Sequence, residues 1–143
     1  MRIAVIGVGH LGKIHARIYK QIPNVNLVAV ADIDPLKAKT VADSFSTKAV
    51  QNYQDILGEV DAVSIASITD AHFSIAKEFL ERGVHVLVEK PLTKDIQQAR
   101  ELVEIAQKKN LKLQVGHSER FNPVTVALFQ KNIQPLYIEA QRF

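Results

Sequence analysis

The sequence contains no cysteine, and it has no long hydrophobic run. Without cysteine the chain cannot form a disulfide, a thiolate metal site or a cysteine nucleophile, and it carries no sign of export. Its apolar stretches are all shorter than the roughly 20 residues that a membrane-spanning helix needs. These features predict a cytoplasmic protein with no membrane partner.

A strong charge of one sign is also lacking. The 18 Lys and Arg residues and the 15 Asp and Glu residues give a net charge of +3, and the two signs alternate along most of the chain. No basic stripe stands out, so we expect no nucleic-acid partner. The five histidines do not follow a recognisable metal-binding spacing, so we expect no metal site.

What the sequence does contain is a globular composition, with 47% hydrophobic and 23% charged residues over 143 positions. Short runs rich in Val, Ile and Ala recur and predict parallel strands covered on both faces. These runs are residues 2–7, 25–32, 62–65, 85–88 and 112–115.

Between the predicted strands, apolar residues recur at helical spacing and predict helices with one buried stripe. The stripes are Leu11, Ile14, Ile18 and Ile22; Ala76, Phe79 and Leu80; and Ile96, Ala99, Leu102, Val103 and Ala106. Alternating strands and helices indicate an α/β fold, a doubly wound parallel sheet with right-handed crossovers.

Two helix starts can be predicted from local residues. Asp34 followed by Pro35 is typical of an N-cap with proline at the first helical position. Thr93, with Pro91 just before it, is the expected N-cap of the helix that contains Leu102.

The pattern changes near residue 121. A helix is predicted over 124–130, Pro135 breaks it, and a strand-like run covers 136–143. A final strand with no partner in the sequence indicates the beginning of a second α/β domain that is mostly missing from this chain. We therefore divide the chain into a domain at 1–120 and the start of a truncated domain at 121–143. The alternative, that the last strand joins the first sheet, stays open.

The segment after the first predicted strand reads Gly7-Val8-Gly9-His10-Leu11-Gly12 and leads directly into a predicted helix. In this context a G-x-G-x-x-G pattern is typical of a Rossmann domain that binds a dinucleotide. Gly7 permits the tight turn, Gly9 lets the pyrophosphate approach the backbone, and Gly12 permits close packing of helix on strand. The pyrophosphate then meets the free N–H groups of the helix. We expect cofactor contacts at Gly7, Gly9, His10, Leu11 and Gly12.

Asp32 ends the second predicted strand, 20 residues after the last glycine of the motif (32 − 12). A carboxylate there accepts hydrogen bonds from the ribose next to adenine and repels a 2′-phosphate, which favours NAD over NADP. Asp34 is more simply the N-cap before Pro35. Lys37 lies near enough in sequence to weaken the preference for NAD slightly.

Further motifs follow at the ends of later strands, and with the glycine turn they resemble the Gfo/Idh/MocA family of sugar and inositol oxidoreductases. The resemblance covers essentially the whole chain. It rests on Gly7-x-Gly9-x-x-Gly12, Asp32, the Ser67 to His72 segment, Glu89-Lys90-Pro91, and the run Gly116-His117-Ser118-Glu119-Arg120-Phe121-Asn122-Pro123.

The resemblance implies roles for three residues. Lys90 is the expected catalytic residue, a fixed positive charge that stabilises the alkoxide developing on the substrate hydroxyl. Glu89 holds the nicotinamide side of the cofactor. Ser67 stands where the family has a Thr or Ser that contacts the cofactor, although Ile68 replaces the proline that commonly follows, which puts the local turn and this assignment in doubt.

The histidines divide into two groups. His10 and His117 are candidates for the cofactor site or pocket, each balanced against a purely structural role. His15 and His85 are expected to be packed structural residues. His72 is expected to fix the loop or helix start after the strand at 62–65, and it is counted with the cofactor-site residues.

The resemblance implies an NAD-dependent oxidoreductase that transfers a hydride between a sugar or nucleotide-sugar hydroxyl carbon and nicotinamide. The closest likeness is to members such as UDP-N-acetylglucosamine 3-dehydrogenases. It also implies that the second domain supplies the remaining acid–base groups and much of an oligomer interface, so we expect a homo-oligomer at full length and no catalytic cycle from this chain alone. The alternative is a non-catalytic NAD(H)-binding sensor or regulatory module. Another Rossmann ligand, such as S-adenosylmethionine, is disfavoured by the glycine spacing.

Overall fold

The computed structural model describes residues 1–131, 137 and 139. Its centre is one sheet of six parallel strands in the order β3-β2-β1-β4-β5-β6. The strands are β1 (Arg2–Ile6), β2 (Asn26–Ala31), β3 (Lys48–Val50), β4 (Ala62–Ile65), β5 (His85–Val88) and β6 (Leu113–Val115). The helices are α1 (His10–Gln21), α2 (Pro35–Phe45), α3 (Thr69–Glu81), α4 (Ile96–Lys108) and α5 (Pro123–Gln130), with short 3₁₀ helices η1 (Tyr53–Ile56) and η2 (Ser118–Phe121).

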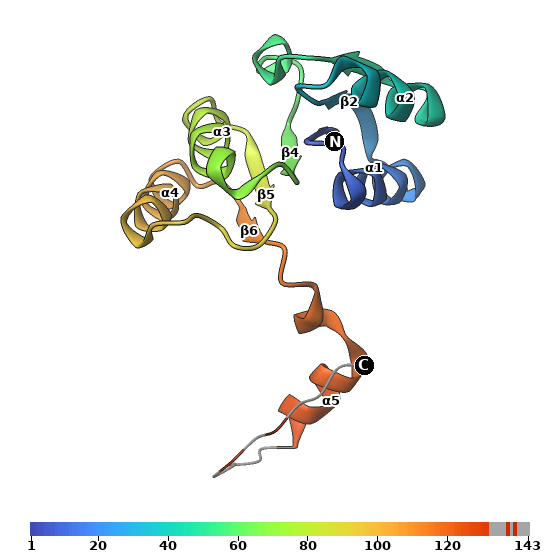
Figure 1. Cartoon of the computed structure of the whole chain (residues 1–143). Helices are drawn as coiled ribbons and strands as arrows, with labels where there is room; N and C mark the ends of the chain where they lie inside the picture. Colours follow the sequence, from blue (N-terminus) through green and yellow to red (C-terminus); the bar gives the residue numbers. More distant parts are fainter. Residues whose placement is uncertain (132–136, 138, 140–143) are drawn as a thin grey trace.

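The helices cover the sheet from both sides. Helices α1 and α2 lie on one face and α3 and α4 on the other (Figure 1). The core on the first face includes Val5 and Ala16, and the core on the second includes Phe79 and Leu102. The predicted fold class, a doubly wound parallel sheet, is therefore confirmed.

All five predicted strands are present, with bounds that differ by at most one residue at either end. Strand β3 is not predicted from the sequence. This strand has only three residues, of which only Val50 is buried, so it lacks the apolar run on which strand prediction depends.

The predicted buried stripe of α1 is wrong. Leu11, Ile18 and Ile22 are 45%, 44% and 40% exposed, whereas the buried residues of this helix are Gly12 and Ala16. Small side chains let the helix axis lie close to the sheet, and the larger apolar side chains are turned outward. A Cβ added at Gly12 would lie 1.8 Å from the Gly7 carbonyl oxygen, which shows how close this approach is.

One of the two predicted helix starts is confirmed. Asp34 caps α2, and its Oδ1 accepts hydrogen bonds from the N–H groups of Leu36 and Lys37. Thr93 does not cap α4; its hydroxyl donates to the Asp95 carbonyl oxygen instead. The Asp95 carboxylate is the cap because it accepts from two N–H groups of the first turn, and α4 begins after it.

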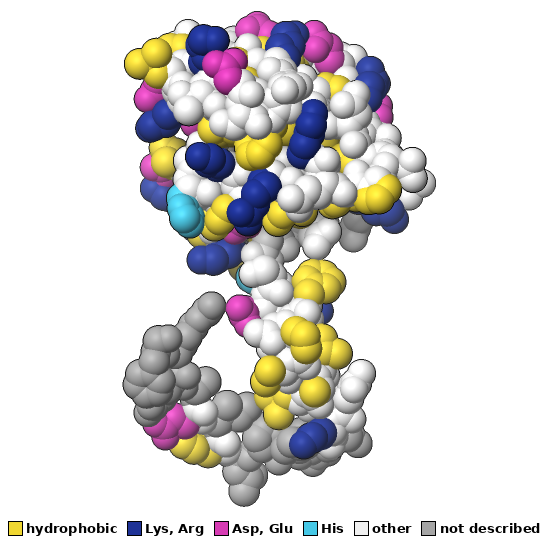
Figure 2. All heavy atoms as spheres, turned by 90° about the vertical axis from the view of Figure 1, so that its right-hand side faces the viewer, with side chains coloured by type: hydrophobic (Ala, Val, Ile, Leu, Met, Phe, Trp, Pro, Cys, Tyr) yellow, Lys and Arg dark blue, Asp and Glu magenta, His cyan; other side chains and the backbone are white. Residues whose placement is uncertain are grey.

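Helix α5 confirms the helix predicted over 124–130 and begins one residue earlier, with Asn122 as its N-cap. It contacts η2, has no buried residue, and stands apart from the three-layered body of helices, sheet and helices (Figure 1). Apolar side chains gather on its surface (Figure 2), and Phe129 is 80% exposed. The predicted strand at 136–143 lies outside the described residues except for Tyr137 and Glu139. No helix in the described part of the chain is long and apolar enough to cross a membrane.

Candidate functional site

The candidate residues come together because parallel strands all end at one edge of the sheet. The glycine turn follows β1, Asp32 follows β2, Ser67 follows β4 by two residues, and Glu89 follows β5. In the sheet order, β1 and β4 are neighbours although the chain visits β2 and β3 between them. Open α/β sheets bind ligands in the crevice at such a switch point. The carboxyl edge beside β1 and β4 is therefore the candidate site.

The three glycines of the turn differ in what surrounds them. Gly7 has φ +83°, and an added Cβ would lie 2.6 Å from the backbone of Ser67. Gly12 has the contact with the Gly7 carbonyl described above. An added Cβ at Gly9 meets no heavy atom within 4 Å. Gly7 and Gly12 are thus required by packing, and Gly9 leaves its backbone open to an approaching ligand.

The N-terminus of α1 is open to an anion. Gly9 is its N-cap residue, no side-chain cap bonds to it within the described structure, and its first turn has no acidic residue. The first N–H groups of a helix have no partner inside the helix and carry the positive end of its dipole. His10 and Leu11 are exposed at this end. The geometry fits a pyrophosphate in contact with this backbone.

Asp32 is fixed against the glycine turn. Its Oδ2 accepts a hydrogen bond from the Val8 N–H at 2.9 Å, and its Oδ1 accepts one from the Asp34 N–H at 3.0 Å. Each carboxylate oxygen keeps a further lone pair that can accept a ribose hydroxyl. The Asp32 carboxylate therefore has a set position with free acceptor capacity.

Lys37 has a partner close by. Its ammonium lies 3.6 Å from Asp34 Oδ2. The Lys37 N–H is the main cause that holds the pKa of Asp34 below its ordinary value, with the Leu36 N–H adding to it. Asp34 is thus ionised and offsets the charge of Lys37 at neutral pH.

His72 links the loops after β4 and β5. It is 1% exposed, with Nδ1 2.9 Å from the Pro91 carbonyl oxygen and Nε2 3.1 Å from the Ser67 carbonyl oxygen. The expectation that His72 fixes the loop after this strand is confirmed. Both ring nitrogens face backbone carbonyls, so any influence on a cofactor passes through these loops. The Ser67 hydroxyl bonds weakly, at 3.4 Å, to the Ile68 carbonyl oxygen.

Glu89 is a largely enclosed acidic side chain at this edge. It is 13% exposed, and its Oε1 lies 3.2 Å from Nε2 of His15, which is 16% exposed. Nδ1 of His15 lies 2.8 Å from the Ser64 hydroxyl. The sequence predicts a packed structural residue at His15 and gives no sign of this link to Glu89. The residue numbers carry no signal for it, because the contact depends on how α1 packs over β4.

Lys90 lies at the same edge and is exposed, and the Lys90–Pro91 peptide bond is cis. Its ammonium forms no ion pair with any described residue, whereas Lys94 nearby is paired with Asp70. His117 follows β6, next to β5, and is also exposed. The described residues contain no group of three His, Asp or Glu side chains that could hold a metal ion.

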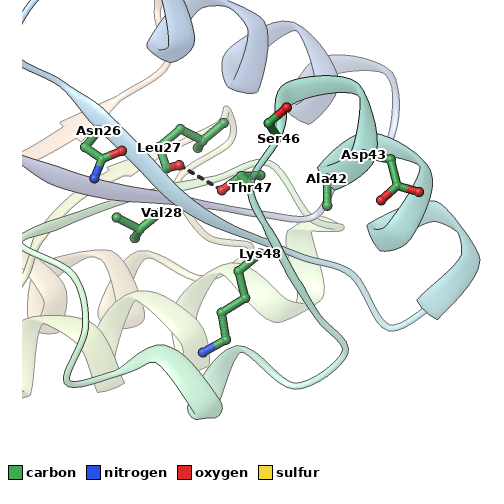
Figure 3. A pocket seen from close by; sticks show the side chains of 8 residues that line it. All are labelled: Asn26, Leu27, Val28, Ala42, Asp43, Ser46, Thr47 and Lys48. Atoms are coloured by element: carbon green, nitrogen blue, oxygen red, sulfur yellow. Dashed lines mark hydrogen bonds between the residues drawn. The ribbon is translucent and has the colours of Figure 1, made fainter.

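A hollow in the surface lies elsewhere (Figure 3). It is lined where β2 and β3 begin and where α2 ends, and the Thr47 hydroxyl donates there to the Leu27 carbonyl oxygen. None of the candidate residues lines it. The hollow is at the amino ends of the strands, away from the switch point.

Comparison with known proteins shows which family this chain belongs to. Residues 1–117 match the model of the Gfo/Idh/MocA oxidoreductase family, described as having an NAD-binding Rossmann fold. The chain belongs to this family. The resemblance inferred from the motifs is therefore confirmed.

Curated members of the family are similar over most of this chain. It is 41% identical over 143 residues to UDP-N-acetylglucosamine 3-dehydrogenase of Acidithiobacillus ferrooxidans, which covers 99% of this chain and 45% of that protein. It is 30% identical over 129 residues to inositol 2-dehydrogenase of Rhizobium meliloti, covering 90% and 39%. The chain thus spans less than half the length of these relatives.

Solved structures of the family share the fold. The Acidithiobacillus ferrooxidans dehydrogenase superposes with a TM-score of 0.87 over 92% of this chain and 43% of that one, at 41% identity. Scyllo-inositol dehydrogenase of Lactobacillus casei, solved with NAD(H) and scyllo-inositol, gives 0.85 over 91% and 40%, at 28% identity.

Proposed function

We propose that this chain binds NAD along the carboxyl edge of its sheet. The pyrophosphate lies at the start of α1, the adenosine ribose at Asp32, and the nicotinamide toward Glu89 and Lys90. The strand order supports this placement because β2 and β5 lie on opposite sides of the turn after β1. A dinucleotide whose centre is at that turn extends its two nucleosides in those two directions.

The carboxylate of Asp32 favours NAD over NADP. It is held in place by Val8 and Asp34, and a 2′-phosphate would bring a second negative charge against it. Lys37 is paired with Asp34, so it offers no free positive charge to compensate.

The proposed reaction is hydride transfer between an alcohol carbon and nicotinamide. Bound NAD would supply the hydride acceptor for the carbon, the hydroxyl proton would pass to an acid–base group of the second domain, and a carbonyl would remain. Negative charge grows on the oxygen as the proton leaves, and Lys90 is placed to stabilise it. The observation that carries this role is the exposed Lys90 ammonium, which has no ion pair among the described residues.

The proposed substrate is a sugar or nucleotide-sugar hydroxyl. The relatives named above support this class, and the 41% identical one favours UDP-N-acetylglucosamine. General acid–base catalysis needs a proton-transferring group in reach of the hydroxyl. Lys90 is proposed as a fixed positive charge and not as that group, so we propose that the chain alone binds NAD without completing turnover.

The second domain, too, belongs to this proposal. Residues 121–143 are its proposed beginning, which the exposed apolar surface of α5 supports. The whole protein is proposed to be a cytoplasmic homo-oligomer, with an acid–base group supplied by that second domain.

The cofactor part is tested by titrating the chain with NADH and, separately, with NADPH. We expect NADH to bind roughly 10- to 100-fold more tightly, the range that one hydrogen bond to a charged group provides. Asp32→Ala should reduce this difference between the NADH and NADPH affinities. Asp43→Ala, a control on the exposed face of α2, should leave the difference unchanged. Failure to bind either nucleotide contradicts the proposal.

The catalytic part is tested in a protein that joins this chain to a complete second domain. Lys90→Ala should abolish NADH formation from NAD and UDP-N-acetylglucosamine and change NADH affinity by less than about twofold, since it removes a charge that matters most in the transition state. Lys94→Ala is the matched control. Unchanged turnover in Lys90→Ala would refute the role of Lys90, whereas no turnover in the joined wild-type protein would favour a sensor module.

A further inference from the structure

We propose that His15, supported by Ser64, is a positioning residue that holds the Glu89 carboxylate in place for the nicotinamide half of the cofactor. This inference rests on the proposed function, because it assigns a task to residues beside the proposed nicotinamide position. The evidence is the geometry of three side chains from three elements of the fold.

The alternation of the strands brings these side chains to one face of the sheet. Ala62 in β4 packs in the core under α1 and α2, so Ser64, two residues later, points to the same face. In β5, Val86 and Val88 belong to the opposite core, so Glu89 points toward the α1 face. His15 reaches both from α1.

One placement of the proton on His15 suits both of its partners. An ionised carboxylate has no proton to donate, so the 3.2 Å approach of Nε2 to Glu89 Oε1 assigns the proton to Nε2. Nδ1 is then the acceptor, and the buried Ser64 hydroxyl donates to it across 2.8 Å. Glu89 thereby selects the tautomer, and Ser64 supports it by holding Nδ1 on the other side of the ring.

The carboxylate is fixed from other directions as well. Its Oε2 accepts a hydrogen bond from the Lys90 N–H at 3.2 Å. An added Cβ at Gly116 would lie 2.6 Å from Oε1, so the absence of a side chain at Gly116 makes room for it. Glu89 therefore has a defined position before any ligand binds, which lowers the entropy lost on binding.

Helix α1 carries both the proposed pyrophosphate site and His15. The N-terminus of α1 is the proposed pyrophosphate site, and His15 lies five residues further along, about 7.5 Å at the usual helical rise. Glu89 is thus held within reach of the nucleoside attached to that pyrophosphate, where its carboxylate can accept an amide N–H or a ribose hydroxyl.

The test compares NADH with ADP-ribose, which keeps the adenosine and pyrophosphate but lacks nicotinamide. We expect His15→Ala to weaken NADH binding about tenfold, the effect of losing one charge-assisted hydrogen bond, and to change ADP-ribose binding less than twofold. His15→Gln, which keeps an amide donor, should recover part of the loss. His85→Ala, at the other end of β5, is the control for both ligands.

A double-mutant cycle with Glu89→Ala separates positioning from a general loss of structure. His15→Ala should cause no further loss of NADH affinity when Glu89 is already alanine. Thermal melting checks that each variant folds. If His15→Ala does not fold, His15→Gln replaces it in the cycle. His15→Gln should lose less NADH affinity, and that loss should likewise disappear when Glu89 is already alanine.

Three outcomes would overturn the inference: equal losses for NADH and ADP-ribose, a loss that persists in Glu89→Ala, or unchanged NADH affinity in folded His15→Ala. In each of these the wild-type chain still binds NADH, so the proposed function stands. If the wild type binds neither ligand, the proposed function and this inference fail together.

Discussion

Both edges of the sheet carry polar side chains, but the two sets make different interactions. At the amino edge the charges are paired: Arg2 with Asp61 at 2.7 Å, and Lys48 with Glu59 at 2.9 Å. At the carboxyl edge, Lys90 has no ion pair among the described residues, and the start of α1 has no side-chain cap.

This difference separates groups that stabilise the fold from groups that we propose bind a ligand. Asp32 and Glu89 are each fixed by hydrogen bonds from the protein and still have acceptor capacity on the open side. The hollow of Figure 3, although it is a concave surface, is bordered by β2, β3 and α2 and has none of these features. The comparison predicts that substitutions at the carboxyl edge affect binding and that those at the amino edge affect only stability.

The largest effect is expected for Gly12→Ala. The new methyl would lie 1.8 Å from the Gly7 carbonyl oxygen, a backbone atom that cannot move aside. Alanine gains about 1 kcal/mol in helix propensity, but overpacking of this severity costs about 3 kcal/mol or more, so the steric effect dominates. Urea unfolding should show this destabilisation. A variant as stable as the wild type would contradict the close packing of α1 on β1.

Gly9→Ala sharpens the comparison because its Cβ meets no protein atom. The free energy of unfolding should stay within about 0.5 kcal/mol of the wild-type value, the usual limit for surface substitutions. NADH affinity should fall at least about tenfold, because the methyl occupies the space that a pyrophosphate needs. Gly58→Ala, which also has no atom within 4 Å, is the matched control. Equal NADH affinity in the two variants contradicts the proposed pyrophosphate site.

The smallest effect is expected at the amino edge. The Arg2 side chain, chiefly through its hydrogen bond, lowers the pKa of Asp61 below its ordinary value. Such a carboxylate adds stability above its unfolded pKa of about 3.9, and this is lost as pH falls through the folded pKa. The melting temperature of Asp61→Asn should therefore be slightly below that of the wild type at pH 7, and the two melting temperatures should converge at acidic pH. NADH affinity should not change. A loss of NADH affinity would break the distinction between the two edges.

Much of this fold can be predicted from the sequence because its strands are buried on both faces and therefore read as apolar runs. Prediction from sequence fails where tertiary packing overrides the local pattern of apolar residues. In α1 the apolar stripe of Leu11 and Ile18 is largely exposed, because the close approach to the sheet requires the small residues Gly12 and Ala16. Three-residue β3 is too short to show a pattern.

Some features of the candidate site can be predicted from the sequence and others cannot. The glycine turn, Asp32, Glu89 and Lys90 can be predicted because each follows a recognisable strand in a known motif. The pairing of His15 with Ser64 and Glu89 cannot, because 49 positions separate His15 from Ser64 and only the packed structure brings them together. Similarly, the link from His72 to the Pro91 carbonyl depends on how two loops meet.

The most direct test of the central claim is to map NAD binding on the isotope-labelled chain by amide chemical shifts. We expect the largest shifts at the carboxyl edge, in the turn from Gly7 to Gly12, at Asp32 and around Glu89, and unchanged amides at residues 46–48 in the hollow of Figure 3. Shifts centred on residues 46–48, or no shifts with NAD in excess, would contradict the proposed cofactor site.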